Sequence, residues 1–311
     1  MIYKFTITPQ GAVGTPFRSD TLFGHACWTM RMYEKKERFD KFIENAAEQK
    51  PELVFSDGFP SGFLPRPLEP LEQIKFDSKE QYDTFKKRSK QMWIKKDELN
   101  ECNSIQWILD SSRNAGEEYK KSPVQQAVLH NVIDRMTGTS LVENGLYAQN
   151  QLWFKGIWEN IDIYVVTEWS REQLSDFILK LFEIGYGRDQ TAGLGKIEIK
   201  SFPEKETFPN IETEWFLSLS RAVPCSSVNI EKSFYQIEPK YGKVWSGLEK
   251  QNHPFKKVIL ETVPGSVLKM NKNTETAGKV LKEIHDNSSV IENCMTILYP
   301  IPQEVVEGAV V

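Results

Sequence analysis

Residues 185–196, with the sequence Gly-Tyr-Gly-Arg-Asp-Gln-Thr-Ala-Gly-Leu-Gly-Lys, place glycine at four of the first eleven positions. Gly185, Gly187, Gly193 and Gly195 leave the backbone N–H groups open to an anion, because no side chain obstructs them. Arg188 and Lys196 lie at the edges of the segment, beside Tyr186. We therefore predict a loop that cradles a sugar–phosphate backbone. The alternative is a tight turn, which needs fewer glycines.

Two common nucleotide-binding motifs are excluded by this segment. A dinucleotide fingerprint has GxGxxG between a strand and a helix, but here Gln190 stands at the third glycine position. A Walker A loop ends in Gly-Lys-Ser/Thr, but Ile197 follows Lys196 and Gln190 stands where its first glycine belongs. The predicted order, helix then loop then strand, is also wrong for both motifs.

The elements on each side of the loop are predicted with little ambiguity. Ser170 and Gln173 form a capping-box pattern at the start of a helix that Gly185 ends. A strand is predicted before this helix, at Ile161–Glu168, and another after the loop, at Leu194–Ile199.

The N-terminus has a similar strand, loop and helix. Alternating apolar residues predict a strand over Ile2–Thr8, and helical spacing of apolar residues predicts a helix from Ser19 to about Lys36. Ser19 and Asp20 are good N-caps for that helix.

The order strand, helix, strands, helix, strand over the first 200 residues or so is that of a ferredoxin-like, RRM-like domain. The proline-bracketed stretch 203–210 is a predicted linker to a second, smaller α+β domain. In it we predict strands at 215–221 and 258–262, and a short helix that contains Val280, Leu281 and Ile284. The fold class is therefore α+β, with domains at 1–205 and 211–311.

The middle of the first domain is less regular. The stretch 51–72 is rich in proline and glycine and is not one regular element. Residues 79–97 are helix-like and basic, a pattern best explained as a solvated helix face. Two extended stretches between Val124 and Phe154 predict a long hairpin or an insertion.

Composition limits the possible functions. The chain has 311 residues, 40% apolar and 26% charged, which supports a globular core. A net charge of −4 disfavours nucleic-acid binding through bulk charge, so an RNA surface must be local. No apolar run is long enough for a membrane span, and no signal pattern opens the chain. The four scattered cysteines fit a reducing cytoplasm rather than a zinc or disulfide framework.

Four ordered motifs resemble the CRISPR RAMP superfamily. They are the first-helix segment Thr15–Trp28, the segment Phe55–Leu68, the segment Ile133–Thr139 and the glycine loop Gly185–Gly195. Together they are similar to the fourth, capping subunits of type III-A Csm effector complexes. The resemblance covers the first 200 residues or so well and the C-terminal third only in general character.

The resemblance implies two ferredoxin-like domains, the second degenerate. It implies binding of the 5′ handle of the CRISPR RNA, with a large polymerase-like subunit on one side and a backbone RAMP subunit on the other. It also implies a thumb-like β-hairpin insertion, mapped here to about residues 98–154. In the family this hairpin separates the handle from the guide and distorts the pairing of guide and target RNA beside it.

The candidate RNA contacts follow from this expectation, since no aromatic RNP1 string is present for stacking on the sheet. Arg18 and Ser19 stand at a helix N-terminus, where unpaired N–H groups favour phosphate, although Ser19 is equally well explained as a cap. His25 is predicted either to donate a hydrogen bond to RNA or to be a satisfied interior histidine. Arg66, held between two prolines, suits a phosphate or a surface salt bridge.

Two further positions have equally open interpretations. Arg135 follows Asp134, so an RNA contact competes with a local ion pair. Tyr186 and Trp153 are aromatic side chains that can stack on a base, although core packing is the better prediction for Trp153.

Three functions remain. A non-catalytic RNA-binding subunit, with no catalytic residue, metal or cofactor, is the leading hypothesis. A RAMP-type, metal-independent endoribonuclease is the alternative, but His25 has no histidine partner nearby in the sequence. A scaffold without RNA contact is disfavoured by the glycine loop. Polymerase chemistry is disfavoured because no GGDD-like carboxylate cluster occurs.

Overall fold

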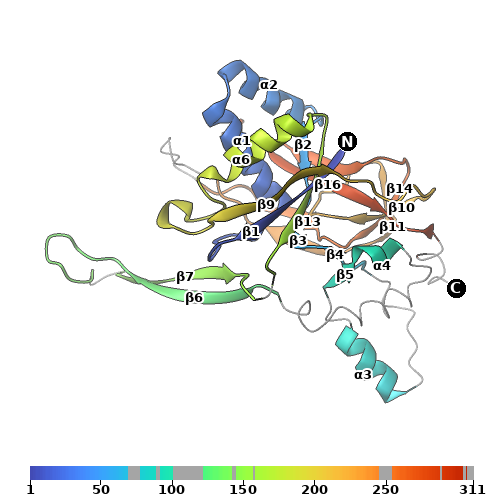
Figure 1. Ribbon diagram of the computed structural model, residues 1–311, viewed down its shortest axis with the longest axis horizontal. Coiled ribbons are helices and arrows are strands. Elements are labelled where there is room, and N and C mark those ends of the chain that lie inside the picture. The colour runs from blue at the N-terminus through green and yellow to red at the C-terminus, as the bar shows by residue number, and fades with distance from the viewer. Residues whose placement is uncertain are drawn as a thin grey trace.

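The computed structural model describes residues 1–68, 78–88, 92–100, 122–141, 145–156, 158–244, 254–287, 289–303 and 306. The fold is α+β, with mostly antiparallel sheets and few helices (Figure 1). Within these residues, no helix has the length and apolarity needed to cross a bilayer.

The first sheet contains the predicted N-terminal strand and the two strands that flank the glycine loop. Its strand order is β2-β8-β1-β9, all antiparallel, with the short β3 also paired to β8. The strands are β1 (Ile2–Pro9), β2 (Leu53–Phe55), β3 (Phe59–Pro60), β8 (Ile161–Thr167) and β9 (Ile197–Lys205). The predicted strands at 2–8 and 161–168 are confirmed, while β9 begins later and runs further than predicted.

Two helices pack on this sheet, α1 (Ser19–Tyr33) and α6 (Arg171–Glu183), and both contribute buried apolar side chains to the main core. The capping box of α6 is confirmed: the Ser170 hydroxyl accepts from the Gln173 amide, and the Gln173 side chain accepts from the Ser170 amide. The prediction that Ser19 or Asp20 caps α1 is wrong. Arg18 is the N-cap residue, without a side-chain cap, and a separate helix, α2 (Lys36–Ala47), follows α1.

The predicted helix over 79–97 is confirmed for its first half and wrong for residues 93–95. The region contains α3 (Lys79–Arg88), β5 (Trp93–Lys95) and α4 (Lys96–Asn100). Strand β5 pairs with β4 (Phe63–Pro65) and buries Trp93 and Ile94 in the core. Packing of these two apolar side chains therefore overrides the helical propensity of the surrounding charged residues.

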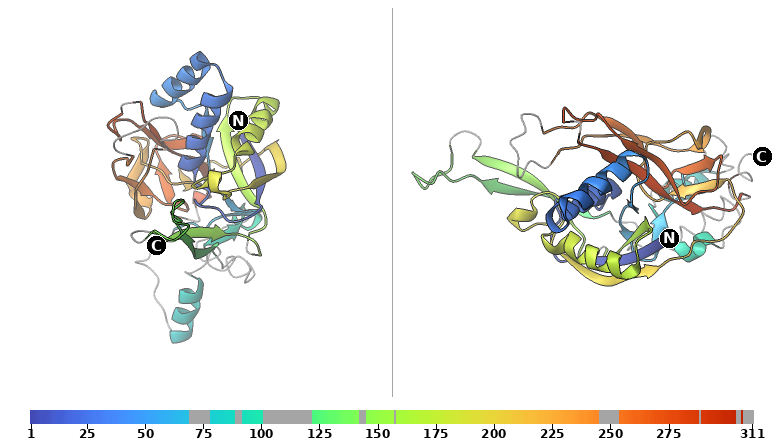
Figure 2. Two further views of the ribbon diagram at one scale, coloured as in Figure 1. Left: turned by 90° about the vertical axis from the view of Figure 1, so that its left-hand side faces the viewer. Right: turned by 90° about the horizontal axis from the view of Figure 1, so that it is seen from above.

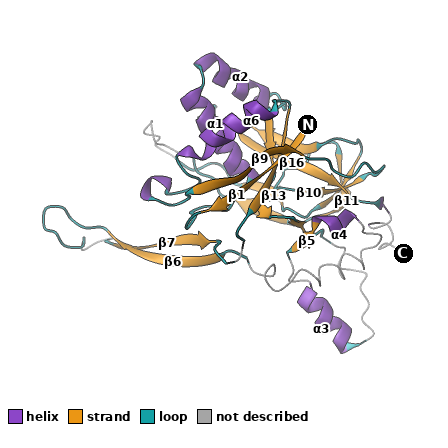
Figure 3. Ribbon diagram, in the orientation of Figure 1, coloured by secondary structure: helices purple, strands orange, loops and turns teal. Residues whose placement is uncertain are grey.

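The C-terminal part is built from strands in the described residues (Figure 3). Its main sheet has the order β11-β14-β10-β16-β15. The strands are β10 (Trp215–Ser218), β11 (Val228–Phe234), β14 (Val267–Met270), β15 (Thr276–Leu281) and β16 (Glu292–Pro300). The predicted helix around Val280 is wrong, because Val280 and Leu281 belong to β15, which pairs with β16 along its whole length.

Two separate ribbons complete the fold. Strands β12 (Ile237–Lys240) and β13 (Ile259–Thr262) form a short ribbon in the C-terminal part. Strands β6 (Val124–Asn131) and β7 (Leu146–Trp153) form a hairpin that extends away from the body (Figures 1 and 2), as the sequence predicts. Residues 101–121 and 142–144 of the predicted insertion lie outside the described residues.

The main hydrophobic core joins both halves of the chain. Phe5 and Ile163 of the first sheet belong to the same buried cluster as Leu217 and Tyr299 of the second. The two predicted domains therefore pack as one body across the predicted linker.

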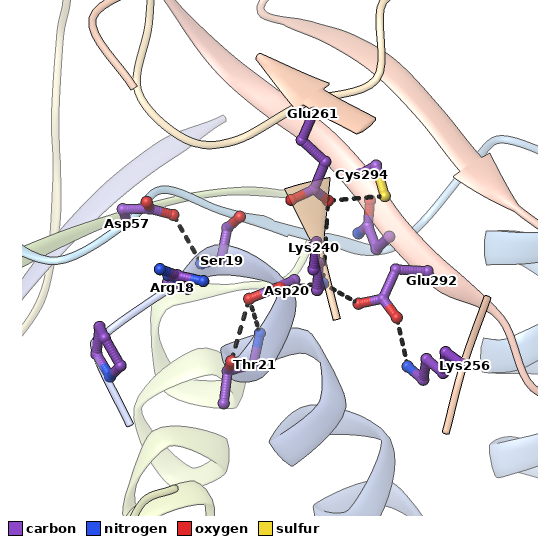
Figure 4. A network of polar contacts seen from close by, with 12 residues as sticks. Arg18, Ser19, Asp20, Thr21, Asp57, Lys240, Lys256, Glu261, Glu292 and Cys294 are labelled. Carbon is purple, nitrogen blue, oxygen red and sulfur yellow. Dashed lines mark hydrogen bonds and ion pairs between the residues drawn. The ribbon is translucent and has the colours of Figure 1, made fainter. Parts of the chain in front are cut away.

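A buried charged cluster also joins the two halves (Figure 4). Lys240 of β12, whose side chain is only 10% exposed, pairs with Asp20 of α1 and with Glu292 of β16. It also lies 3.9 Å from Glu261 of β13. Burial alone would lower the pKa of Lys240, but Glu292, Asp20 and Glu261 raise it above its ordinary value, so the lysine stays charged. This charge holds the start of α1 against the C-terminal strands.

Replacing Lys240 with Met should leave Asp20 and Glu292 buried with less compensation. We expect a loss of about 3–5 kcal/mol in the free energy of unfolding, measured by urea denaturation. Lys41→Met, at an exposed position of α2, is the control and should change stability by less than about 0.5 kcal/mol. Equal stability of the two variants would contradict a structural role for the cluster.

Candidate nucleic-acid interface

The glycine loop connects α6 to β9 and contains one short 3₁₀ turn, η3 (Gln190–Ala192). All four of its glycines have positive φ. At Gly195 the reason is clear: a Cβ atom there would lie 1.9 Å from the Tyr186 carbonyl oxygen. The glycines thus let two stretches of backbone cross closely.

The loop amides are largely used inside the chain. Eight of the twelve backbone N–H groups from Gly185 to Lys196 donate internal hydrogen bonds, including Gly187 to His25 Nε2 (3.0 Å), Arg188 to Thr15 Oγ1 (3.0 Å) and Gly195 to the Ala12 carbonyl (2.8 Å). Gly185 and Gly195 are themselves buried. The hypothesis that these amides cradle phosphates is therefore wrong for these eight groups.

Tyr186 is not available to stack on a base. Its ring is fully buried between Phe17, at 4.7 Å between centroids, and His25, at 5.0 Å. Its hydroxyl donates to the Pro16 carbonyl (2.8 Å) and accepts from the Arg18 amide (3.2 Å). Tyr186 therefore fastens the glycine loop to the start of α1.

The N-terminus of α1 is occupied by carboxylates of the protein. The Ser19 amide donates to Asp57 Oδ1 (2.9 Å), and the Thr21 amide donates to Asp20 Oδ1 (2.5 Å). Ser19 itself is buried. The predicted phosphate site on the helix amides is therefore wrong for Ser19. Arg18 is partly exposed. Burial opposes ionisation of Asp20, but Lys240 and, less strongly, Arg18 lower the pKa of its carboxyl.

Asp57 has the most unusual environment of these groups. Burial raises the pKa of this carboxyl to about 7, and the nearby Asp20 raises it further, against the effects of the Ser19 amide, Arg18 and Arg221. Near neutral pH the Asp57 carboxyl is therefore partly ionised, and its negative charge would repel a phosphate bound beside it.

His25 matches the interior interpretation of the sequence. Its Nε2 accepts from the Gly187 amide, and its ring stacks on Tyr186. Burial lowers the pKa of His25 to about 4, so the imidazole is neutral at pH 7. A hydrogen bond from Nε2 to RNA would require breaking the contact with Gly187.

Arg188 and Lys196 remain as exposed cations at the loop. Arg188 is half-exposed, pairs with Asp189 (2.9 Å) and donates to the Asn150 carbonyl of β7 (2.7 Å). Asp189 also accepts from the Gln149 side chain of β7. The loop is thereby attached to the base of the hairpin, with Lys196 exposed at its end.

The structure brings together ten of the twelve predicted residues around the loop and the start of α1. Arg66 lies apart: it follows β4, its amide donates to the Met92 carbonyl, and its backbone packs against Gly265. Arg135 lies at the exposed turn of the hairpin, where Asp134 accepts from the Met136 amide. No ion pair joins Asp134 to Arg135 among the described residues. The core-packing prediction for Trp153 is wrong, since this side chain is 38% exposed.

Sequence reasoning missed three residues that build the site. Asp57 lies within the motif Phe55–Leu68 and could have been found from it. Asp189 lies in the glycine loop with a positive φ of 62°, which its short polar side chain tolerates. Gln149 carries no sequence signal, because its role depends on how the hairpin crosses the loop.

The state of His25 can be tested by titration. Its pKa of about 4 in the folded protein is below the unfolded value of about 6.5, so its contribution to stability is complete above about pH 6.5 and declines as the pH falls toward 4. We expect NMR to show a neutral ring down to about pH 5. We also expect His25→Gln, which keeps an acceptor, to remove up to about 3 kcal/mol of this pH dependence. An imidazole that titrates near pH 6.5 would contradict the structure.

Comparison with known proteins gives one consistent result at the level of structure. No family model matches the sequence, and no curated protein matches it. The fold matches a chain in the crystal structure of a Csm1–Csm4 cassette with cA4, with a TM-score of 0.59 and 15% identity over 97% of this chain and 98% of that chain. The same cassette with AMPPNP gives a TM-score of 0.58 and 17% identity over the same shares.

A third match is a chain of the Csm3–Csm4 subcomplex of the type III-A CRISPR–Cas interference complex, with a TM-score of 0.51 and 15% identity over 96% of this chain and 99% of that chain. Csm4 is the component common to both kinds of complex. The resemblance predicted from four sequence motifs is confirmed, and the chain has the fold of Csm4, a subunit of the type III-A CRISPR–Cas complex.

Proposed function

We propose that this chain is a non-catalytic subunit of a type III-A CRISPR effector complex and binds the 5′ handle of the CRISPR RNA. The observation that carries the proposal is the Csm4 fold over 97% of the chain. The first sheet supports the ferredoxin-like assignment, because its strand order and its two helices follow the β-α-β-β-α-β scheme. The second domain is proposed to be a degenerate copy.

The RNA surface is proposed to consist of side chains around the glycine loop. Arg18, Arg188 and Lys196 supply positive charge there, and the internal hydrogen bonds of the loop hold its backbone in place. This arrangement suits a protein with a net charge of −4, because the cations are concentrated on one surface. Phosphates would then be bound by guanidinium and ammonium groups, with the loop backbone as their support.

The solved complexes support the proposed partners. A chain with this fold occurs in a Csm1–Csm4 cassette and in a Csm3–Csm4 subcomplex. We propose that this chain likewise joins a large polymerase-like subunit to a backbone RAMP subunit. The β6–β7 hairpin, attached to the glycine loop through Arg188 and Asp189, would place the target RNA beside the handle.

The alternative, a RAMP-type endoribonuclease, receives less support from the geometry. His25 was the only candidate base, and its Nε2 is occupied by the Gly187 amide. A lone pair engaged in this way, on a group with a pKa of about 4, is a weak base for a 2′-hydroxyl.

RNA binding can be tested with the double variant Arg18→Ala/Arg188→Ala. We expect weaker capture of handle-bearing RNA in a gel shift with partner subunits present. The slope of log K against log salt should fall by about 1.4, since each contact to a single-stranded phosphate contributes about 0.7. Arg31→Ala, at the exposed far end of α1, is the matched control. An unchanged affinity and an unchanged salt slope in the double variant would contradict the proposed RNA site.

The proposal that the chain is non-catalytic leads to a second prediction. The purified chain, incubated with repeat-containing precursor RNA in EDTA, should yield no specific cleavage products on a denaturing gel. Specific cleavage that disappears in His25→Ala but persists in Arg31→Ala would establish the endoribonuclease instead.

A further inference from the structure

The β12–β13 ribbon buries charged side chains on one face and exposes apolar side chains on the other. Register pairs Pro239 with Leu260 and Lys240 with Ile259, so alternate residues face opposite sides. The inner face carries Lys240 and Glu261, which are buried in the charged cluster, and Ile259, which packs in a small apolar cluster with Ile284 and Cys294. In a half-exposed antiparallel sheet, the apolar face normally packs on the core and the polar face meets water.

The outer face of the ribbon is apolar and open. Ile237 is 55% exposed, Tyr241 75%, Val258 54% and Leu260 61%. Phe255, at the end next to Tyr241, is 48% exposed. A group of large apolar side chains on one face is the kind of patch that marks an interaction site.

The register explains why the chain does not bury this face itself. Shifting β12 by one residue would separate Lys240 from Asp20 and Glu292, and shifting β13 by one residue would turn Glu261 away from Lys240. The charged cluster that joins the two halves of the molecule therefore keeps the apolar side chains pointing outward. The exposure of these apolar side chains is therefore a consequence of the fold.

The charges at the rim of this face are unequal. Lys243 and Lys257 are exposed at the end formed by Tyr241, Phe255 and Val258. Lys243 lies over the Phe255 ring, 4.8 Å from its centroid, which holds the ammonium group beside the patch. Glu238 lies on the inner face, opposite Glu261 in the register, and is paired with Arg221. The open rim charge is therefore positive at the Phe255 end.

We propose that the outer face of the β12–β13 ribbon docks a protein subunit of the effector complex, whose contact surface is apolar at its centre and carries carboxylates opposite Lys243 and Lys257. The proposal rests on the proposed function, because it takes the partner from that complex. Charge complementarity selects the partner: apolar side chains bury against an apolar surface, and the two ammonium groups set its orientation.

Two other occupants fit the face less well. RNA would need cations across the surface, whereas Lys243 and Lys257 lie at one end of this face and the aliphatic side chains of Ile237 and Leu260 cover the rest. A second copy of the chain would bring Lys243 and Lys257 near identical groups, because a two-fold contact places the same patch on both sides.

The double variant Val258→Ser/Leu260→Ser tests the docking surface. Both side chains are more than half exposed, so the variant should fold, which an unchanged Tm will show. We expect its affinity for one of the two partner subunits, the polymerase-like or the backbone subunit, to fall about tenfold or more in biolayer interferometry. Leu179→Ser/Ile184→Ser, at exposed positions on and next to α6, is the matched control and should bind like the wild type.

A charge-reversal variant tests the orientation. Lys243→Glu/Lys257→Glu should slow association with the same subunit, and the deficit should shrink as salt is raised. If the wild-type chain binds both subunits and the Val258→Ser/Leu260→Ser variant binds both with the same affinity, the docking surface is wrong but the proposed function is not. A variant that loses self-association in sedimentation, or handle RNA in the gel shift, with subunit affinity intact, also overturns the docking surface. A wild-type chain that binds neither subunit overturns the proposed function and this surface together.

Discussion

The arrangement of the candidate site depends on the burial of Tyr186. Its ring is enclosed by Phe17 and His25, and its hydroxyl connects the carbonyl of Pro16 to the amide of Arg18. A buried tyrosine hydroxyl costs free energy unless it is hydrogen-bonded, and here both its donor and an acceptor lone pair are used. One side chain thus fixes the end of the first loop, the start of α1 and the glycine loop relative to one another. The positions of the surface cations Arg18 and Arg188 depend on these contacts of Tyr186.

The glycines therefore serve close approach of backbone rather than anion binding. Without a side chain, Gly195 can lie against the Tyr186 backbone and accept a hydrogen bond from the Tyr186 amide, and Gly187 brings its own amide to the imidazole of His25. An N–H group that already has a partner inside the protein gains little from a phosphate. A glycine-rich sequence is compatible with both uses, and only the hydrogen bonds of the folded chain separate them.

Local signals predicted much of the first domain. The capping box at Ser170 and the alternation in Ile2–Thr8 are contained in a few neighbouring residues, so they can be interpreted without the rest of the chain. Errors occurred where distant residues decide. Val280 and Leu281 have the spacing of a helix, but they form a strand because they pair with β16. Trp93 lies among residues of helical propensity, but it forms a strand and packs in the core. In the site, the cations Arg18, Arg188 and Lys196 were predicted. The contact of Asp57 with the Ser19 amide and that of Gln149 with Asp189 were not, because each joins residues far apart in the sequence.

Within the residues that the structure describes, the contacts that join the hairpin β6–β7 to the body come from β7. Leu152 bridges to Val13, while Gln149 and Asn150 contact the glycine loop. A two-stranded ribbon alone is marginally stable in water, so these anchors keep it in one direction before any ligand arrives. The conformational entropy of the hairpin is lost when the protein folds, so binding a ligand does not require a further loss of entropy to orient it. The same anchors act at the fulcrum of a lever, where a small rotation of the glycine loop would move the exposed turn around Arg135 through a much larger arc.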